Sequence, residues 1–206
     1  GCVGQSALGL LPLPGHCAEG FHGRAFGPLG LGEKLSVLES AQGDALARAA
    51  AAVDELGLQI HIHAIGDAAV RQALDAIEYV QQRNGIRDRR PVIAHAQLVD
   101  DADIGRFAAL GVIPNMQPLW AQMDALMTVL TVPRLGVERA DRQYRMATLV
   151  GTGAALALGS DWPVSSGAPL EGIAIGVSRR TADGVPAGGW TPQEIAGRLP
   201  LEFAED

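Results

Sequence analysis

The chain is poor in cysteine and in positive charge. Cys2 and Cys17 are the only cysteines among 206 residues, too few for the disulfide scaffold of a small secreted domain. Sixteen Lys and Arg residues stand against twenty-three Asp and Glu residues, giving a formal net charge of −7. This balance excludes the basic surface that nucleic-acid binding and attachment to anionic lipid require. We therefore expect a cytoplasmic protein that binds neither nucleic acid nor membrane.

Long apolar runs and several catalytic motifs are also missing. The one long apolar run near the start, residues 7–13, is interrupted by Gly9 and Pro12 and has no basic flank. It predicts neither a membrane-spanning helix nor a signal peptide. The sequence contains no Gly-rich phosphate loop, no Gly-x-Ser-x-Gly turn and no Cys-x-x-Cys pair. These absences count against a nucleotide-binding protein, a serine hydrolase and a redox enzyme.

What the sequence does contain is typical of a globular domain. Apolar residues make up 48% of the chain and charged residues 19%, enough to bury a substantial core and to exclude general disorder. The length predicts one domain, at about 150 residues per domain. Residues 1–31 are rich in Gly and Pro and keep no period, so we expect an irregular segment over 1–43 and a regular domain over 44–206.

Short apolar strands alternate with amphipathic helices from Asp44 onward. In the first strand, Ile60 and Ile62 face one side, and His61 and His63 face the other. This alternation of elements predicts an α/β fold with a parallel sheet. The strands are expected at residues 58–63, 91–95, 112–115 and 154–158, and the helices at 44–56, 67–81, 101–110 and 141–150, with a last short helix from Thr191.

Three of these strands end in residues that bind metals or carry protons. His61 and His63 lie on the first strand, His95 ends the second, and Asp161 follows the fourth. Because the carboxyl ends of parallel strands meet at one edge of a sheet, we expect these side chains to converge. Imidazole and carboxylate are zinc ligands. One strand histidine alone is more often a hydrogen-bonded core residue, and Asp161 alone fits a turn cap, but the combination favours a metal site.

Other polar or sulfur-containing residues have simpler explanations. Asp67 fits the N-cap of the helix that follows the first strand. The charged run over residues 87–90 is typical of a solvated loop. Met116, Trp120 and Met123 either line a substrate pocket or pack in the core.

Four segments in unbroken order resemble the amidohydrolase superfamily, and most closely the family-3 amidohydrolases that include N-substituted formamide deformylases. They are residues 61–67 (HIHAIGD), 93–97 (IAHAQ), 106–118 and 158–170, the last beginning LGSDWPV. The resemblance implies strands five to eight of a (β/α)₈ TIM-type barrel. It also implies that His63 and His95 are metal ligands and that Asp161 is both a metal ligand and the catalytic proton shuttle. His61, on the same strand face as His63, is a candidate for orienting a ligand rather than for binding the metal itself.

The chain differs from that family at two places. The first-strand His-x-His pair and the bridging ligand of strand four are not recognisable here. The length also falls short of the roughly 250 residues of such a barrel, and the first residue is Gly1. We therefore expect an incomplete barrel of about four β/α units, the C-terminal half of the fold.

The function implied by the resemblance is metal-dependent hydrolysis of a carbon–nitrogen bond in a small amide or formamide. The expected cofactor is a divalent metal, with zinc favoured, and the loop over residues 119–144 is expected to select the substrate. The alternative is a catalytically inactive, truncated half-barrel that self-associates, because unpaired strand edges are pairing sites for other chains. In either case we expect a homo-oligomer.

Overall fold

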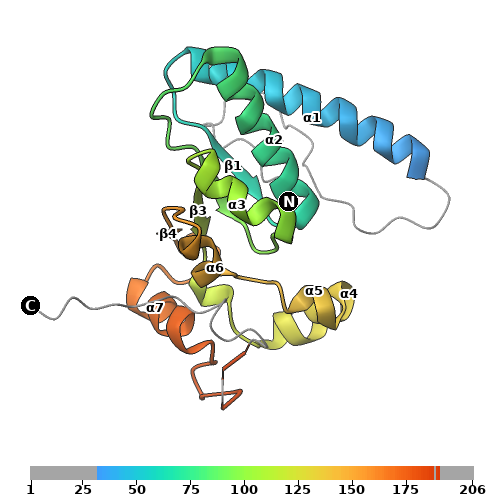
Figure 1. The fold of residues 1–206 in the computed structure, drawn as a ribbon. Helices are drawn as coiled ribbons and strands as arrows, with labels where there is room; N and C mark the ends of the chain where they lie inside the picture. Colours follow the sequence, from blue (N-terminus) through green and yellow to red (C-terminus); the bar gives the residue numbers. More distant parts are fainter. Residues whose placement is uncertain (1–31, 188, 191–206) are drawn as a thin grey trace, which may run out of the picture.

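A parallel sheet lies at the centre of the molecule. The computed structural model describes residues 32–187 and 189–190, and the expectations for residues 1–31 and for a helix from Thr191 lie outside these. The sheet contains β1 (His61–Ala64), β2 (Val92–His95), β3 (Ile113–Met116) and β4 (Ala157–Leu158), hydrogen-bonded in that order and all parallel (Figure 1). The predicted parallel α/β sheet is confirmed, and each strand overlaps its predicted range. β1 begins at His61 rather than at residue 58, and β4 covers only Ala157–Leu158 of the predicted 154–158.

The predicted helices are present with altered limits. α2 (Asp67–Asn84) and α3 (Asp101–Ala109) begin where the sequence indicated. α1 (Gly32–Glu55) begins well before Asp44, so residues 32–43 are helical, where an irregular segment was expected. α6 (Met146–Gly151) is shorter than expected, because an isolated bridge from Gln143 to Leu98 occupies the chain just before it.

Several short helices were not predicted. The expected loop over residues 119–144 contains η2, a π-helix (Met127–Thr131), α4 (Val132–Leu135) and α5 (Val137–Ala140), and η1 (Pro118–Trp120) overlaps its start. Helices of one turn are too short to show an apolar period, which is why the sequence did not reveal them. α7 (Pro169–Ser178) was missed because glycines and β-branched residues, which weaken helices, fill its apolar stretch.

The two faces of the sheet have different environments. Ile60, Ile62 and Ile93 are buried on the face that α2 and α3 cover, within one core cluster with Leu74 and Phe107. The other face is only partly covered. It presents a row of half-buried residues in register across the strands, namely His63, Ala94, Asn115 and Ala157. The polar residues of this row, His63 and Asn115, therefore lie on the face away from the apolar core.

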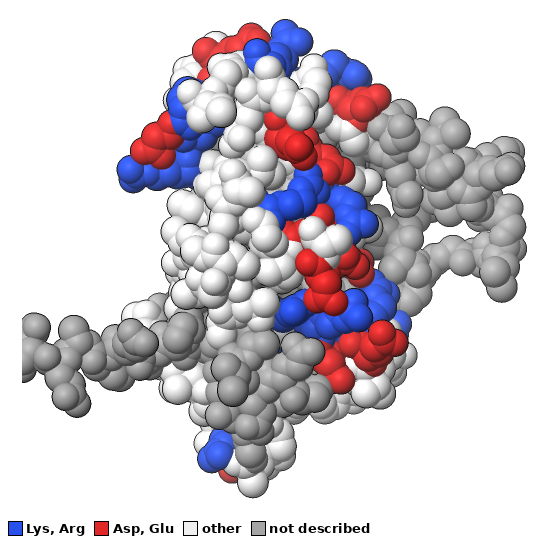
Figure 2. All heavy atoms as spheres, in the orientation of Figure 1, with Lys and Arg blue, Asp and Glu red and all other residues white. Residues whose placement is uncertain are grey.

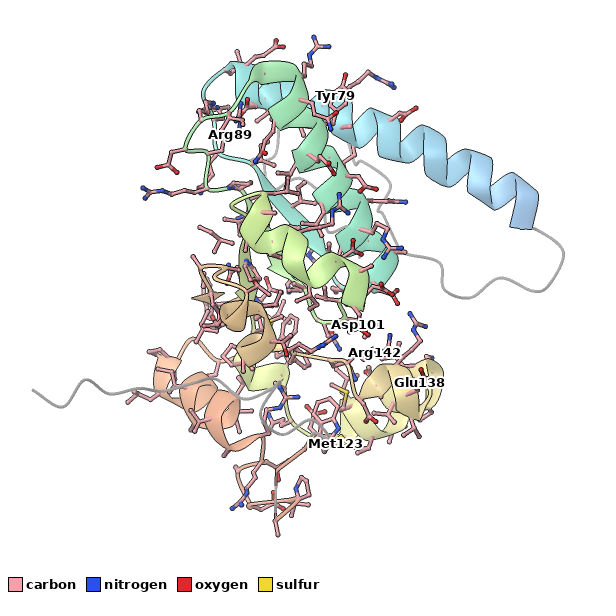
Figure 3. All side chains as sticks on the ribbon, viewed as in Figure 1. Tyr79, Arg89, Asp101, Met123, Glu138 and Arg142 are labelled. Carbon is pink, nitrogen blue, oxygen red and sulfur yellow. The ribbon has the colours of Figure 1, made fainter. Side chains whose placement is uncertain are left out.

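Ion pairs connect the helices on the outside of the sheet. Figure 2 shows acidic and basic side chains alternating down one side of the molecule, without a separate basic patch on that face. Arg106 joins α3 to Asp75 and Glu78 of α2 at 2.7 and 2.8 Å. Arg142 lies between Asp101 and Glu138, at 3.7 and 3.4 Å (Figure 3). No helix in the described part of the chain has both the length and the apolar character of a membrane crossing.

The charged run at residues 87–90 is not merely solvated, and this expectation was wrong. Asp54 of α1 is 3% exposed and Arg89 is 8% exposed. The guanidinium of Arg89 donates from Nε and Nη2 to the two oxygens of Asp54, at 2.7 and 3.0 Å. Arg87 adds a bond of 2.6 Å, and Asn84 adds one of 2.9 Å. Residues thirty or more positions from Asp54 thus join it in one network, which fixes α1 to the end of α2 and the approach to β2.

The charge of Asp54 is favoured inside this network. Burial acts to raise the pKa of Asp54, but the hydrogen bonds from Arg89 and Asn84 and the charges of Arg89 and Arg87 outweigh it, leaving the pKa below its ordinary value. A carboxyl whose pKa is lower in the folded state stabilises the fold above its unfolded pKa. That contribution disappears as the pH falls through the folded pKa.

Removing the Asp54 carboxylate is expected to be costly. Asp54→Ala leaves the buried Arg89 without a counter-charge, and breaking a buried pair in this way costs about 3–5 kcal/mol. Glu55→Ala is the matched control, because its pair with Arg83 is exposed on both sides and such pairs contribute less than about 1 kcal/mol. Urea denaturation measures both variants. Equal losses would contradict this account, as would an Asp54→Ala effect that did not shrink below about pH 4.

Candidate functional site

Two histidines from neighbouring strands meet at the carboxyl edge of the sheet. His63 Nδ1 lies 2.7 Å from His95 Nε2, and the ring centroids are 4.1 Å apart. Strand alternation alone would send His95 to the helix-covered face with Ile93. Its backbone has φ 74, a left-handed conformation that ends the strand and allows the imidazole to reach His63. The structure therefore brings together the two histidines that the sequence singled out.

Asp161 reaches the same edge from beyond β4. Its negative charge acts to raise the pKa of both His63 and His95. Its backbone is also left-handed, with φ 55. Its Oδ2 is buried and has no hydrogen-bond partner within the described residues. His61 is exposed on β1 and acts on the same two histidines through its charge alone.

Burial keeps both central imidazoles neutral. Burial, together with the charges of His95 and His61, lowers the pKa of His63 to about 4, against the opposing effect of Asp161. Burial also lowers the pKa of His95, while Gln117 and Asp161 act in the other direction. Neutral imidazole is the form that binds metals. At neutral pH the edge therefore presents imidazole nitrogen and carboxylate oxygen, donor types that suit zinc.

Sequence reasoning did not identify Gln117 as part of this site. Its Oε1 lies 2.6 Å from His95 Nδ1, and its side chain is buried. Trp120 stacks on the ring of His95, with 5.3 Å between centroids and 9° between planes. The signal was available in part, because Gln117 follows β3 directly, just as Asp161 follows β4. Met116 is fully buried and Met123 packs against the core cluster, so core packing accounts for these two, whereas Trp120 packs against the core cluster and also against His95.

Asn115 is a second residue that sequence reasoning missed. It shares the register row of His63 on the open face of the sheet. Its Oδ1 is buried without a hydrogen-bond partner in the described residues. A Cβ atom added to Gly159 would lie 3.0 Å from that oxygen. Gly159, two residues before Asp161, therefore leaves the space that the Asn115 amide occupies.

Asp67 was expected to cap its helix, and this expectation was wrong. The N-cap of α2 is Gly66, and Asp67 is the first helical residue. The carboxylate of Asp67 accepts two hydrogen bonds from Arg139 Nη2, at 2.9 and 2.8 Å. The pair connects the start of α2, next to β1, with α5.

Within the described residues, no three His, Cys, Asp or Glu side chains form a ready-made cation site. The two imidazoles are hydrogen-bonded to each other instead, so the two nitrogens that a metal would use share one proton. The two neutral imidazoles are donors that suit a metal ion. The Asp161 oxygen without a hydrogen-bond partner in the described residues suits one as well.

Filling the space at Gly159 is expected to disturb the site. Gly159→Ala forces the Asn115 amide to move, and overpacking of this kind costs about 1–3 kcal/mol. Gly105→Ala in α3 is the control, because no atom lies within 4 Å of its added methyl group and alanine stabilises a helix by up to about 1 kcal/mol. Chemical denaturation measures both. In the double variant, Asn115→Ala should remove the stability loss caused by Gly159→Ala. If that loss remained, the clash with the Asn115 amide would not be its cause.

Comparison with known proteins identifies the group to which this strand-end site belongs. The amidohydrolase family matches the chain over residues 26–204. The chain belongs to the amidohydrolase family.

The relatives are much longer than the matched region. Protein LONG AFTER FAR-RED 3 of Arabidopsis thaliana is 43% identical over 129 residues, which are 62% of this chain and 22% of that protein. The putative amidohydrolase YtcJ of Bacillus subtilis (strain 168) is 34% identical over 128 residues, 62% of this chain and 23% of that protein. The chain thus spans under a quarter of the curated relatives it matches.

Two solved structures have a similar fold. They are uncharacterized metal-dependent hydrolases from Pyrococcus furiosus and Pyrococcus horikoshii OT3, each with a TM-score of 0.56 and 32% identity. The match covers 66% of this chain and 26% of each of those chains.

Proposed function

We propose that this chain forms the C-terminal half of a barrel-type, metal-dependent hydrolase that cleaves carbon–nitrogen bonds in small amides or formamides. Membership of the amidohydrolase family supports the proposal, as does the likeness to two proteins described as metal-dependent hydrolases. The observation that carries it is the 2.7 Å approach of His63 Nδ1 to His95 Nε2, two rings on which the charge of Asp161 also acts.

Three side chains would hold a divalent metal, with zinc favoured. His63 would bind through Nδ1, His95 through Nε2 and Asp161 through its buried Oδ2, while His61 lies behind them. For both of these ring nitrogens to bind the ion, the proton that they share would move to His63 Nε2. When bound, such an ion polarises a carbonyl and lowers the pKa of water.

Asp161 carries the proton in the proposed reaction. Its carboxylate accepts a proton from water as the water oxygen bonds to the carbonyl carbon of the substrate. The carbon–nitrogen bond then breaks, and Asp161 returns the proton to the leaving amine. The products are a carboxylic acid, which is formate for a formamide, and an amine. We expect the segment over residues 119–144 to select the amine and acyl groups.

Zinc titration of the full chain tests the ligand set. We expect weak binding, because two histidines and one aspartate are fewer ligands than a two-metal site uses. His63→Asn and His95→Asn are each expected to weaken zinc binding by more than about tenfold. A loss of about tenfold already follows when a residue that only hydrogen-bonds to a metal ligand is removed. Glu171→Gln, exposed in α7, is the control. Two tightly held metals per chain, or binding unchanged in both histidine variants, would contradict the proposal.

The proton-carrying role is tested by Asp161→Asn. In a preparation that releases formate from an N-alkyl formamide, kcat is expected to fall by about 10²–10⁴-fold, with metal content little changed. Asp183→Asn provides a control carboxylate far along the chain, in an exposed turn. Near-normal turnover by Asp161→Asn would mean that another group carries the proton.

A second candidate is an inactive half-barrel that self-associates. Within the described residues, β1 and β4 each pair with a strand on one side only, and Leu158 of β4 is 39% exposed. Such edges pair with other chains unless they are charged or covered. We expect light scattering to detect a dimer that Leu158→Lys weakens and Leu170→Lys, on exposed α7, does not. A monodisperse monomer over a wide concentration range would contradict self-association.

A further inference from the structure

His95 is held in place by the segment that follows β3, rather than by its own strand. Oε1 of Gln117 meets Nδ1 of His95 at 2.6 Å. The indole of Trp120 lies parallel to the imidazole at 5.3 Å. Gln117 is the N-cap residue of η1 and Trp120 is its last residue. The segment that forms η1 therefore contacts one edge of the His95 ring through Gln117 and one face through Trp120.

The amide of Gln117 has a fixed orientation. Its side chain is 2% exposed, and its Nε2 donates to the carbonyl oxygen of Asn115 at 3.3 Å. The carbonyl oxygen Oε1 must then be the atom that faces His95. Because Oε1 can only accept, Nδ1 of His95 must carry the proton. In a neutral imidazole this leaves the lone pair on Nε2, directed at His63.

The short helix η1 packs against α7. Pro118 is buried, and the Cβ position of Gly172 in α7 lies 3.3 Å from Cγ of Pro118. Gly172 thus allows α7 to pack closely against η1. The placement of His95 depends in this way on elements that come more than twenty residues after it in the sequence.

We propose that Gln117 and Trp120 are positioning residues: Gln117 fixes His95 in the Nδ1-protonated form, and Trp120 fixes the plane of its ring. The metal role of His95 rests on the proposed function. The tautomer and its cause do not, because they concern the metal-free chain. Metal-binding histidines characteristically donate their other N–H to an acceptor of this kind, which orients the ring.

Nitrogen-15 NMR of the full, metal-free chain tests the tautomer directly. His95 is expected to be protonated on Nδ1 in the unaltered protein and to sample both tautomers in Gln117→Leu, which keeps the bulk but lacks the acceptor. Gln117→Glu restores an acceptor and should restore the Nδ1–H form. Gln122→Leu is the matched control, because that amide donates to Leu119 at 2.8 Å in the same region. A predominantly Nε2-protonated His95 in the unaltered chain would overturn the inference.

Zinc titration of the same variants provides the second readout. Gln117→Leu is expected to lose about 10–100-fold in zinc affinity, and Gln117→Glu should regain most of it. Trp120→Leu should weaken zinc binding while leaving the tautomer unchanged. Equal zinc affinity in Gln117→Leu and the unaltered chain would overturn the positioning role. A chain with Nδ1-protonated His95 that binds no zinc would instead contradict the proposed function and leave the tautomer assignment intact.

Discussion

Parallel pairing of the four strands determines where every residue of the site lies. In a parallel sheet all carboxyl ends fall on one edge, so residues separated by thirty or more positions meet there. The register pairs His63 with Ala94 and Ala94 with Asn115, which sets His95 one residue beyond the row. An antiparallel arrangement of the same strands would place His63 and His95 at opposite ends of the sheet.

The strand ends leave regular geometry where the site residues lie. His95 and Asp161 both have left-handed backbones, although neither is glycine. Such conformations cost about 1–3 kcal/mol each and persist only where the surrounding structure enforces them. Here a fully buried core cluster holds β1 and β2 from one side, and η1 holds the ring of His95 from the other. The open face of the sheet and its polar edge thus depend on the rigid, apolar face behind them.

The regular part of the fold was accessible from the sequence, and the long-range contacts were not. Alternation between Ile60, His61, Ile62 and His63 predicted the two faces of β1, because a strand with one buried face must alternate, although β1 begins only at His61. The contact of Asp54 with Arg89 was missed because a run of charges does not reveal a partner on a distant helix. The role of Gln117 was missed for a related reason. It depends on a one-turn helix whose position is set by α7, and no local period encodes that packing.

X-ray absorption at the zinc edge, on the zinc-loaded chain, tests most directly whether the strand ends form a metal centre. We predict a spectrum with two imidazole nitrogens and carboxylate oxygen in the coordination sphere. His95→Asn should lose one imidazole, while Glu171→Gln should match the unaltered chain. A zinc environment without imidazole, or one that is identical in His95→Asn, would contradict the account.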